Sequence, residues 1–226
     1  MHVLRSALIL GCCLSLPACA RDAAVEDGVD AAADAPADAA AFAPAPGEPD
    51  LDAVRAATER YRDVNVALAE GFIPDPSGMC VTAEMEGQPA EKGAMGVHYF
   101  RPDLLGLAGP GGGRVNGNGT HTDFNMPAVL IYEPQADGSV ELVGVENLVF
   151  QKAWAEAGHT GPPTFHGVPY QAMQDDPATE ADEAHGFEPH YEHHAWLFRA
   201  NPNGVFEAFN PAVTCGQAGH VADAQS

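Results

Sequence analysis

The hydrophobic period of this chain changes once, near Cys80, and that change limits the fold more than any single motif. Four apolar residues before it recur at the intervals of one helix face: Val54, Tyr61, Val64 and Leu68. Asp50 can cap such a helix, and Gly71 can end it. We therefore predict one helix over residues 51–70.

After Cys80 the apolar residues come in short runs rich in β-branched side chains, which is typical of strands. The runs cover residues 94–100, 128–133, 140–150 and 193–199, with a short edge strand over 206–209. Asp137-Gly138, between the second and third runs, favours a β-hairpin. We predict an α+β fold: a curved antiparallel sheet with the N-terminal helix packed on it, long loops and one disulfide.

The N-terminus has the features of an export signal. Its apolar stretch, from Ser6 to Leu16, is shorter than the about 20 residues that a transmembrane helix needs. Leu16-Pro17-Ala18-Cys19 resembles the bacterial lipobox, in which cleavage before the cysteine leaves a lipid-carrying N-terminus. We predict a signal peptide over residues 1–18 and lipidation at Cys19; an ordinary secretory protein cleaved nearby is the alternative.

This N-terminal sequence predicts an exported protein that its lipid holds in the bacterial envelope, facing the periplasm or the cell surface. Ala20 stands where the inner-membrane retention signal has an aspartate, which favours the outer membrane. Cys12 and Cys13 leave with the signal and Cys19 carries lipid, so Cys80 and Cys215 remain of the five cysteines. In an oxidising compartment such a pair is expected to form a disulfide.

The charge of the chain excludes one class of partner. A formal charge of −22 repels nucleic acid, and the membrane reached through the N-terminal lipid is the one predicted partner. Low-complexity sequence rich in Ala, Asp and Pro predicts a disordered tether over residues 19–50. A single domain is predicted over residues 51–216, followed by a flexible tail over 217–226.

Four polar residues share a predicted strand face with apolar neighbours: His98, Glu133, Glu146 and His194. A carboxylate on an apolar face costs several kcal/mol unless it is paired, hydrogen-bonded or bound to a cation. Two imidazoles and two carboxylates together form a donor set for a divalent transition metal such as zinc, copper, manganese or iron. We predict that these four side chains meet in one pocket.

Simpler interpretations stay open for each of them. Glu133 can be solvated at its strand end, and Glu146 can accept hydrogen bonds from a loop or from Arg199. His98 and His194 can be satisfied core residues. In the His-rich segment from residue 185 to 194, His190 is a secondary metal candidate and His193 a third. Acidic neighbours there would favour imidazole protonation, so a pH-sensitive patch is the alternative.

Several catalytic patterns are missing from the sequence. The Gly-rich stretch from Gly106 lacks the Lys-Ser or Lys-Thr ending of a phosphate-binding loop. There is no G-x-S-x-G, H-E-x-x-H or C-x-x-C. A glycosidase could use Glu133 and Glu146, but no aromatic residues line up as a sugar platform.

Four segments resemble a widespread group of uncharacterised exported bacterial proteins and lipoproteins. They are GAMGVHYF, AVLIYEP, LVGVEN and HAWLFRANPNGVFEAFNPAVTC. The group's motifs are G-M-G-x-H-Y, Y-E-P, L-V-G-V-E and H-x-W-L-x-x-x-N-P-x-G-x-F. The resemblance implies the same four site residues and Cys215 as the closing cysteine. This chain has Asn147 where the group has tyrosine and Phe198 where it has a second tryptophan.

The sequence thus predicts a cell-envelope lipoprotein that binds a metal ion or a small ligand in a His/Glu pocket. A metal-dependent envelope enzyme and a non-catalytic interaction or scaffolding lipoprotein are the alternatives. No protein partner is indicated.

Overall fold

The computed structural model describes residues 42–75, 77–108, 113–184 and 186–219. The predicted signal peptide, Cys19, most of the predicted tether and the end of the tail lie outside these ranges. All the described residues belong to one compact unit.

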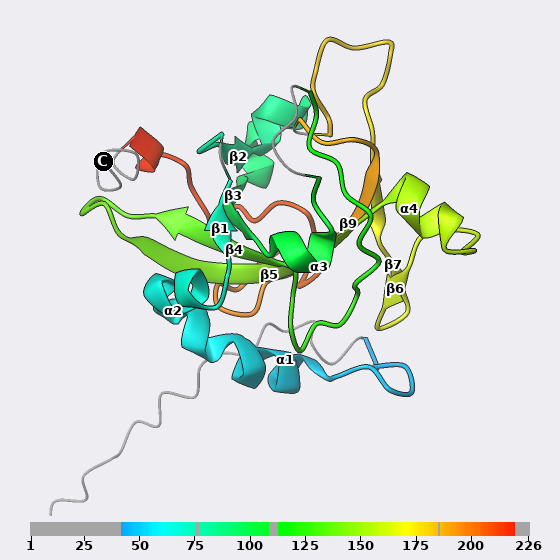
Figure 1. Ribbon diagram of the computed structural model, residues 1–226. Helices are drawn as coiled ribbons and strands as arrows, with labels where there is room; N and C mark the ends of the chain where they lie inside the picture. Colours follow the sequence, from blue (N-terminus) through cyan, green and yellow to red (C-terminus); the bar gives the residue numbers. More distant parts are fainter. Residues whose placement is uncertain (1–41, 76, 109–112, 185, 220–226) are drawn as a thin grey trace, which may run out of the picture. The chain divides into compact units, whose positions relative to one another are not determined.

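An antiparallel sheet forms the body of this unit (Figure 1). Its strands pair in the order β1–β3–β4–β5–β9–β8, and β2 also pairs with β3. Their bounds are β1 Ile73–Pro74, β2 Cys80–Thr82, β3 Ala94–Phe100, β4 Val129–Pro134, β5 Val140–Phe150, β8 Gln171–Met173 and β9 His190–Ala195. A separate hairpin pairs β6 Thr164–Phe165 with β7 Val168–Pro169. The helical segments are α1 Leu51–Thr58, η1 Glu59–Arg62, α2 Val64–Ala69, η2 Ala83–Glu86, η3 Ala90–Lys92, α3 Pro102–Leu105 and α4 Gln151–Glu156. The predicted α+β class with an antiparallel sheet is confirmed.

The predicted N-terminal helix is interrupted rather than continuous. Asp50 caps α1 as expected, because its side chain accepts a hydrogen bond from the Ala53 amide at 2.7 Å. Asp63 does the same for α2, accepting from the Asn65 amide at 3.0 Å, and so begins a new helix within the predicted one. This break turns the Leu68 side chain outward. Leu68 is therefore 44% exposed and not buried on the helix face as predicted.

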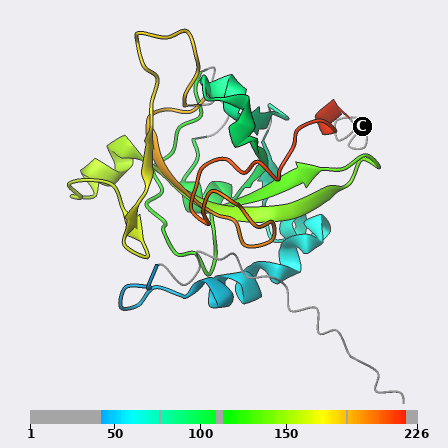
Figure 2. The same ribbon diagram turned by 180° about the vertical axis from the view of Figure 1, so that it is seen from behind.

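The two faces of the sheet bury different side chains. On one face, Leu130, Tyr132 and Val145 share a core with Val54 and Tyr61 of the helical segment. The Tyr132 hydroxyl donates a hydrogen bond to the Tyr61 carbonyl at 2.7 Å. Figures 1 and 2 show α1 and α2 along this side of β4 and β5.

The opposite face carries smaller apolar clusters. Phe100, Val129, Leu148 and Phe150 pack there with Phe187 from the segment before β9. Alternation along the strands also brings polar residues to this face, which becomes important for the site.

The strand predictions were good in the centre of the sheet and poor at its end. The β4–β5 hairpin is confirmed, with Gly138 at φ 84° in its turn. β9 begins at His190, earlier than predicted, because the His/Glu sequence that resembles a loop is buried and paired. It ends at Ala195, because the Trp196 amide donates to the Val205 carbonyl instead of continuing the ladder. Residues 206–209 form no strand.

The residues from Phe42 to Pro49, called here the N-terminal strap, pack on the domain. The Phe42 and Phe206 rings are 5.2 Å apart. Both ring nitrogens of His166 approach strap carbonyls: Nε2 lies 2.8 Å from Pro49 and Nδ1 lies 3.2 Å from Phe42. Glu48 accepts a hydrogen bond from the His166 amide at 2.9 Å. The described end of the predicted tether is therefore held against the β6–β7 turn.

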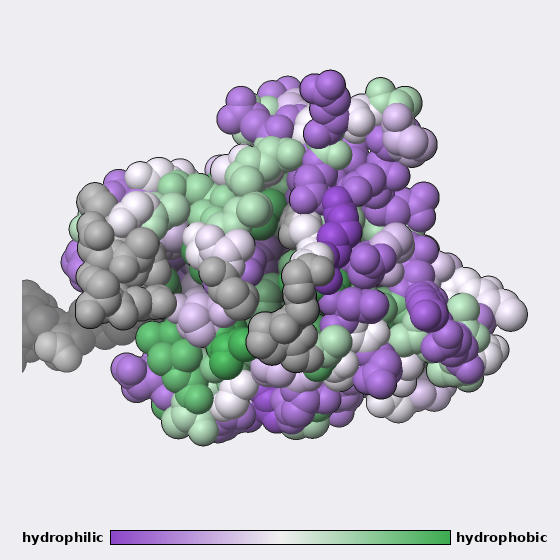
Figure 3. Space-filling view, turned by 45° about the horizontal axis from the view of Figure 1, so that its top comes forward, coloured by the Kyte–Doolittle hydropathy of each residue, from purple (hydrophilic) through white to green (hydrophobic). Residues whose placement is uncertain are grey.

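No helix in the described ranges has both the length and the apolar character needed to cross a bilayer. On the surface seen in Figure 3, hydrophilic residues gather at the right and apolar residues at the left. The large apolar residues that are exposed in the described part are Leu68, Ile73, Met85 and Met126.

Cys80 and Cys215 form the predicted disulfide, with their Cα atoms 5.6 Å apart. The bond joins β2 to the C-terminal segment across a sequence separation of 135 residues. It therefore closes a loop that contains nearly the whole sheet.

We expect the double variant Cys80→Ser/Cys215→Ser to lose about 4 to 5 kcal/mol of unfolding free energy, because the unfolded chain regains the entropy of an open loop. Urea unfolding of the oxidised wild type and the variant measures the difference. A variant as stable as the wild type would contradict a structural role for the bond.

Candidate metal centre

Three strands bring imidazole and carboxylate side chains together on the face opposite α1. Glu146 of β5 lies directly across from His194 of β9 in the strand register. On its other side, Glu146 pairs with Val129 of β4, and His98 of β3 pairs with Ile131 two residues further along. His98 and Glu146 thus approach each other over the β4 side chains between them.

Their donor atoms are spaced like ligands of one ion. Glu146 Oε2 lies 3.4 Å from His98 Nε2 and 3.7 Å from His194 Nε2. One ligand atom from each of the three residues lies within 4.8 Å of the others. Two donors that each lie near 2.0–2.1 Å from a tetrahedral ion are about 3.3 Å apart, so small adjustments would close this set around a cation.

The electrostatics of Glu146 favour a cation at this point. The residue is 1% exposed, and burial, together with the charges of Glu192 and Glu86, raises the pKa of its carboxyl well above the usual range. Among the described residues, no donor makes a hydrogen bond to Glu146 Oε2. A bound divalent ion would stabilise the carboxylate form and satisfy this oxygen.

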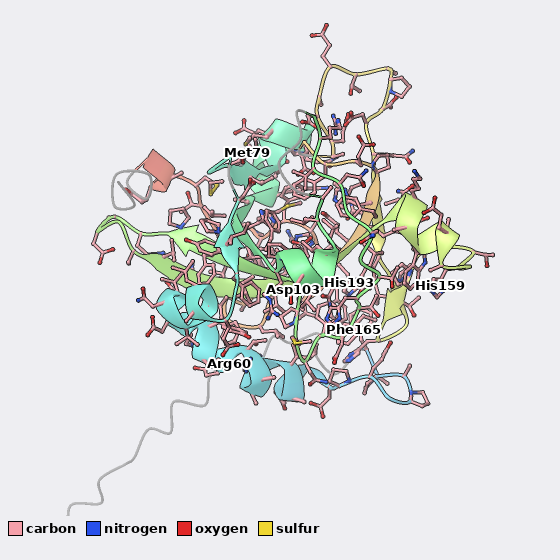
Figure 4. All side chains as sticks on the ribbon, in the orientation of Figure 1. Arg60, Met79, Asp103, His159, Phe165 and His193 are labelled. Atoms are coloured by element: carbon pink, nitrogen blue, oxygen red, sulfur yellow. A yellow bond between two sulfur atoms is a disulfide. The ribbon has the colours of Figure 1, made fainter. Side chains whose placement is uncertain are left out.

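A small cavity of about 20 Å³ adjoins two of the three residues, His98 and Glu146. Its polar lining residues are Asp75, His98, Glu146, His190 and Glu192, and its apolar ones include Phe100, Leu148 and Phe187. Met79 also lines it, from the side of the sheet opposite Arg60 (Figure 4). A space of this size holds about one water molecule, which could complete the coordination of an ion.

Glu133 does not join the centre. It lies four residues beyond Val129 on β4, roughly 13 Å along the strand. It is buried there, but Arg199 Nη2 lies 2.8 Å from its Oε2, and the Thr214 amide donates to its Oε1 at 2.8 Å. Arg199 thus pairs with Glu133 and not with Glu146. The prediction that all four residues meet holds for three of them.

His190 lies on the same face, next to a carboxylate that the sequence analysis did not propose as a ligand. His190 Nε2 is 3.3 Å from Glu192 Oε2, and Glu192 Oε1 is 3.9 Å from His194 Nδ1. The alternation of His190, Glu192 and His194 was the signal for this arrangement. If this segment had been predicted as a strand, the alternation would have placed all three side chains on one face.

His193 points to the opposite face of β9, among aromatic rings. Its ring stacks on Tyr170 with centroids 5.0 Å apart, and Phe165 lies 5.9 Å away (Figure 4). Burial, reinforced by His194 and His166, lowers the pKa of His193 to about 3. His193 is therefore a neutral core residue and not part of the centre.

Comparisons with known protein families, with curated proteins and with solved structures found no match. The resemblance to the group of exported proteins therefore stays a prediction.

We expect two buried glutamates on this face to respond oppositely to amidation. Glu133→Gln removes the nearer of two carboxylates that Arg199 contacts, leaving Glu141 at 3.0 Å, and should lower the unfolding free energy by about 1.5 kcal/mol. Glu146→Gln removes a buried charge and should leave the stability of metal-free protein unchanged or raised. Urea unfolding in the presence of a chelator measures both; equal losses would contradict this division of roles.

His193 should make the unfolding free energy depend on pH. Its pKa is near 6.5 when unfolded and about 3 when folded, so between these values only the unfolded chain takes up the proton. The contribution of His193 is fully present above pH 6.5 and is lost as the pH falls toward 3, by up to about 1.4 kcal/mol per unit.

Urea unfolding at several pH values from 7 to 4 tests this slope. His193→Phe keeps an aromatic ring without a titrating group, so its stability should fall less steeply with acid. Identical slopes for the variant and the wild type would refute the assignment.

Proposed function

We propose that this chain is a cell-envelope lipoprotein that binds a divalent transition metal through His98, Glu146 and His194. The observation that carries the proposal is the meeting of three donor atoms, within 4.8 Å of one another, at a buried carboxylate oxygen with no hydrogen-bond donor in the described part. A buried acid in such surroundings is costly without a cation.

The donor set narrows the choice of metal. Two imidazoles and one carboxylate suit zinc in a three-ligand site, and they also suit ferrous iron. Copper(II) binds the same donors at least as tightly as zinc, and manganese binds them most weakly of the four. Calcium and magnesium favour oxygen donors and are poorer matches.

The envelope location rests on the N-terminal residues and on the disulfide. The lipobox-like sequence ending at Cys19 predicts anchoring by lipid, with the outer membrane favoured. The Cys80–Cys215 bond agrees with an oxidising compartment outside the cytosol.

Metal-dependent catalysis is the second candidate, and the shape of the surface favours it. Three protein ligands leave a coordination position for water or substrate. A cleft of about 900 Å³ between η2, β8 and the segment after β9 has Glu86 in its lining. It shares Gln171, Glu207 and Ala208 with a 160 Å³ pocket that reaches Glu192 and His194. A substrate could therefore approach the centre from this cleft.

Metal binding is tested on the purified full-length protein by elemental analysis and by titration with Zn²⁺ or Co²⁺. We expect the wild type to retain metal, and His98→Ala and Glu146→Gln to bind it at least about tenfold more weakly, since even loss of an outer-shell partner costs this much. Glu133→Gln is the matched control and should bind normally.

Equal trace metal in the wild type, His98→Ala and Glu146→Gln would refute the proposal. Weakening in Glu133→Gln as large as in Glu146→Gln would show that the effect comes from destabilised folding and not from a lost ligand.

A further inference from the structure

The last strand of the sheet, β8, borders the 900 Å³ cleft along its outer edge. Four consecutive residues line the cleft there: Gln171, Ala172, Met173 and Gln174. Because side chains alternate between the two faces of a strand, an uninterrupted run of four indicates that the cleft follows the strand's edge. The cleft therefore lies where a further strand of the sheet would lie.

The hydrogen bonds of β9 show which of its residues bond to β8. The Gln151 amide donates to the Pro189 carbonyl at 2.9 Å, which continues the β5–β9 register by one residue. In antiparallel pairing, residues along a central strand direct their backbone groups alternately to one neighbour and to the other. Since Pro189 bonds to the β5 side, His190 and Glu192 direct their backbone groups to β8.

Ala172 is the residue of β8 whose backbone faces outward. Gln171 and Met173 lie across from Glu192 and His190, so their backbone groups bond to β9. Ala172 lies between them, and its amide and carbonyl therefore point away from β9. Within the described ranges no other backbone group bonds to these two groups, and Ala172 is exposed. The edge of β8 can thus accept the backbone of another segment.

The cleft beside this edge is acidic. Its charged lining residues are four glutamates and one lysine: Glu86, Glu91, Glu183, Glu207 and Lys92. Lys92 directs its amine to Gln88 Oε1 at 3.0 Å, whereas Glu91 and Glu207 are exposed. Carboxylates that line a cleft in a chain of charge −22 attract basic segments and repel acidic ones.

We propose that β8 binds a basic segment of another protein as an added, extended strand. Ala172 supplies the main-chain pairing, and Glu91 and Glu207 favour Lys or Arg side chains in the segment. A second copy of this chain fits less well, because it would bring the same glutamates against each other. The inference does not depend on a bound ion, although a 160 Å³ pocket that shares Gln171 and Glu207 with the cleft reaches His194.

The test measures the fluorescence polarisation of labelled peptides with the full-length protein, in the presence of a chelator. The probes are (Lys-Val)₃, (Glu-Val)₃ and a (Lys-Val)₃ peptide in which every backbone amide is N-methylated and cannot donate. We expect the first probe to bind. The other two should bind at least about tenfold more weakly, because one lacks the positive charges and the other lacks the backbone donors.

Three variants locate the binding. Ala172→Pro removes an outward amide that makes no ladder bond, so the sheet should still form while (Lys-Val)₃ binding weakens about tenfold. Glu91→Gln/Glu207→Gln leaves the strand unchanged and should weaken binding about fivefold at low salt. Asp52→Asn/Glu156→Gln makes the same change of charge at exposed positions outside the cleft and should bind as tightly as the wild type.

Each contrary outcome has a definite meaning. No binding of (Lys-Val)₃ up to about 1 mM, or equal binding of all three probes, would overturn the proposal. Equal weakening in Glu91→Gln/Glu207→Gln and in the Asp52→Asn/Glu156→Gln control would show attraction by net charge and not by this cleft, and would also overturn it. A wild-type dimer that Ala172→Pro makes monomeric in analytical ultracentrifugation would assign the edge to a second copy instead.

Discussion

The register between β5 and β9 is the constraint on which the candidate centre depends. It sets Glu146 across from His194 on one face and Asn147 across from His193 on the other. A slip of one residue would exchange the two faces, because side chains alternate with a period of two. The aromatic rings around His193 and the apolar clusters around Leu148 could not both stay buried after such a slip. Core packing on both faces therefore holds the side chains of the candidate centre in position.

Two buried glutamates on the same face show how neighbours decide a carboxylate's role. Glu133 has a guanidinium and a backbone amide, both at 2.8 Å, and it ties the C-terminal segment to β4. Glu146 has two imidazoles and repelling carboxylates nearby. The first glutamate is satisfied by the folded chain alone. The second has a buried oxygen, Oε2, that no donor of the described residues satisfies, and such perturbed groups cluster at functional sites.

The elements that could be predicted from the sequence were those in which apolar residues recur at a regular spacing. The β4–β5 hairpin and β3 follow from apolar alternation and from the Asp137-Gly138 turn. The disulfide followed from cysteine counting. The break at Asp63 was harder to see, because the apolar spacing continues across it and only the capping hydrogen bond reveals a new helix.

The sequence predicted correctly which face of the sheet the site residues occupy. It did not predict how far along the strands they lie from one another. Alternation correctly placed Glu133 on the face of Glu146, but it carries no information about how far apart two strands' residues lie. Glu192 was missed because its polar neighbours made β9 look like a loop. The alternating His and Glu residues of β9 are buried because β5 and β8 pair with this strand. The sequence of the segment does not show which strands it will pair with.

The N-terminal strap gives the domain an unusual mechanical connection. The His166 ring contacts the carbonyls of Phe42 and Pro49 at the two ends of the strap, and the His166 amide donates a hydrogen bond to Glu48. Tension from the N-terminal side would reach the β6–β7 hairpin before it reached α1. A pull on the chain would thus act first on the hydrogen bonds between the strap and the β6–β7 turn.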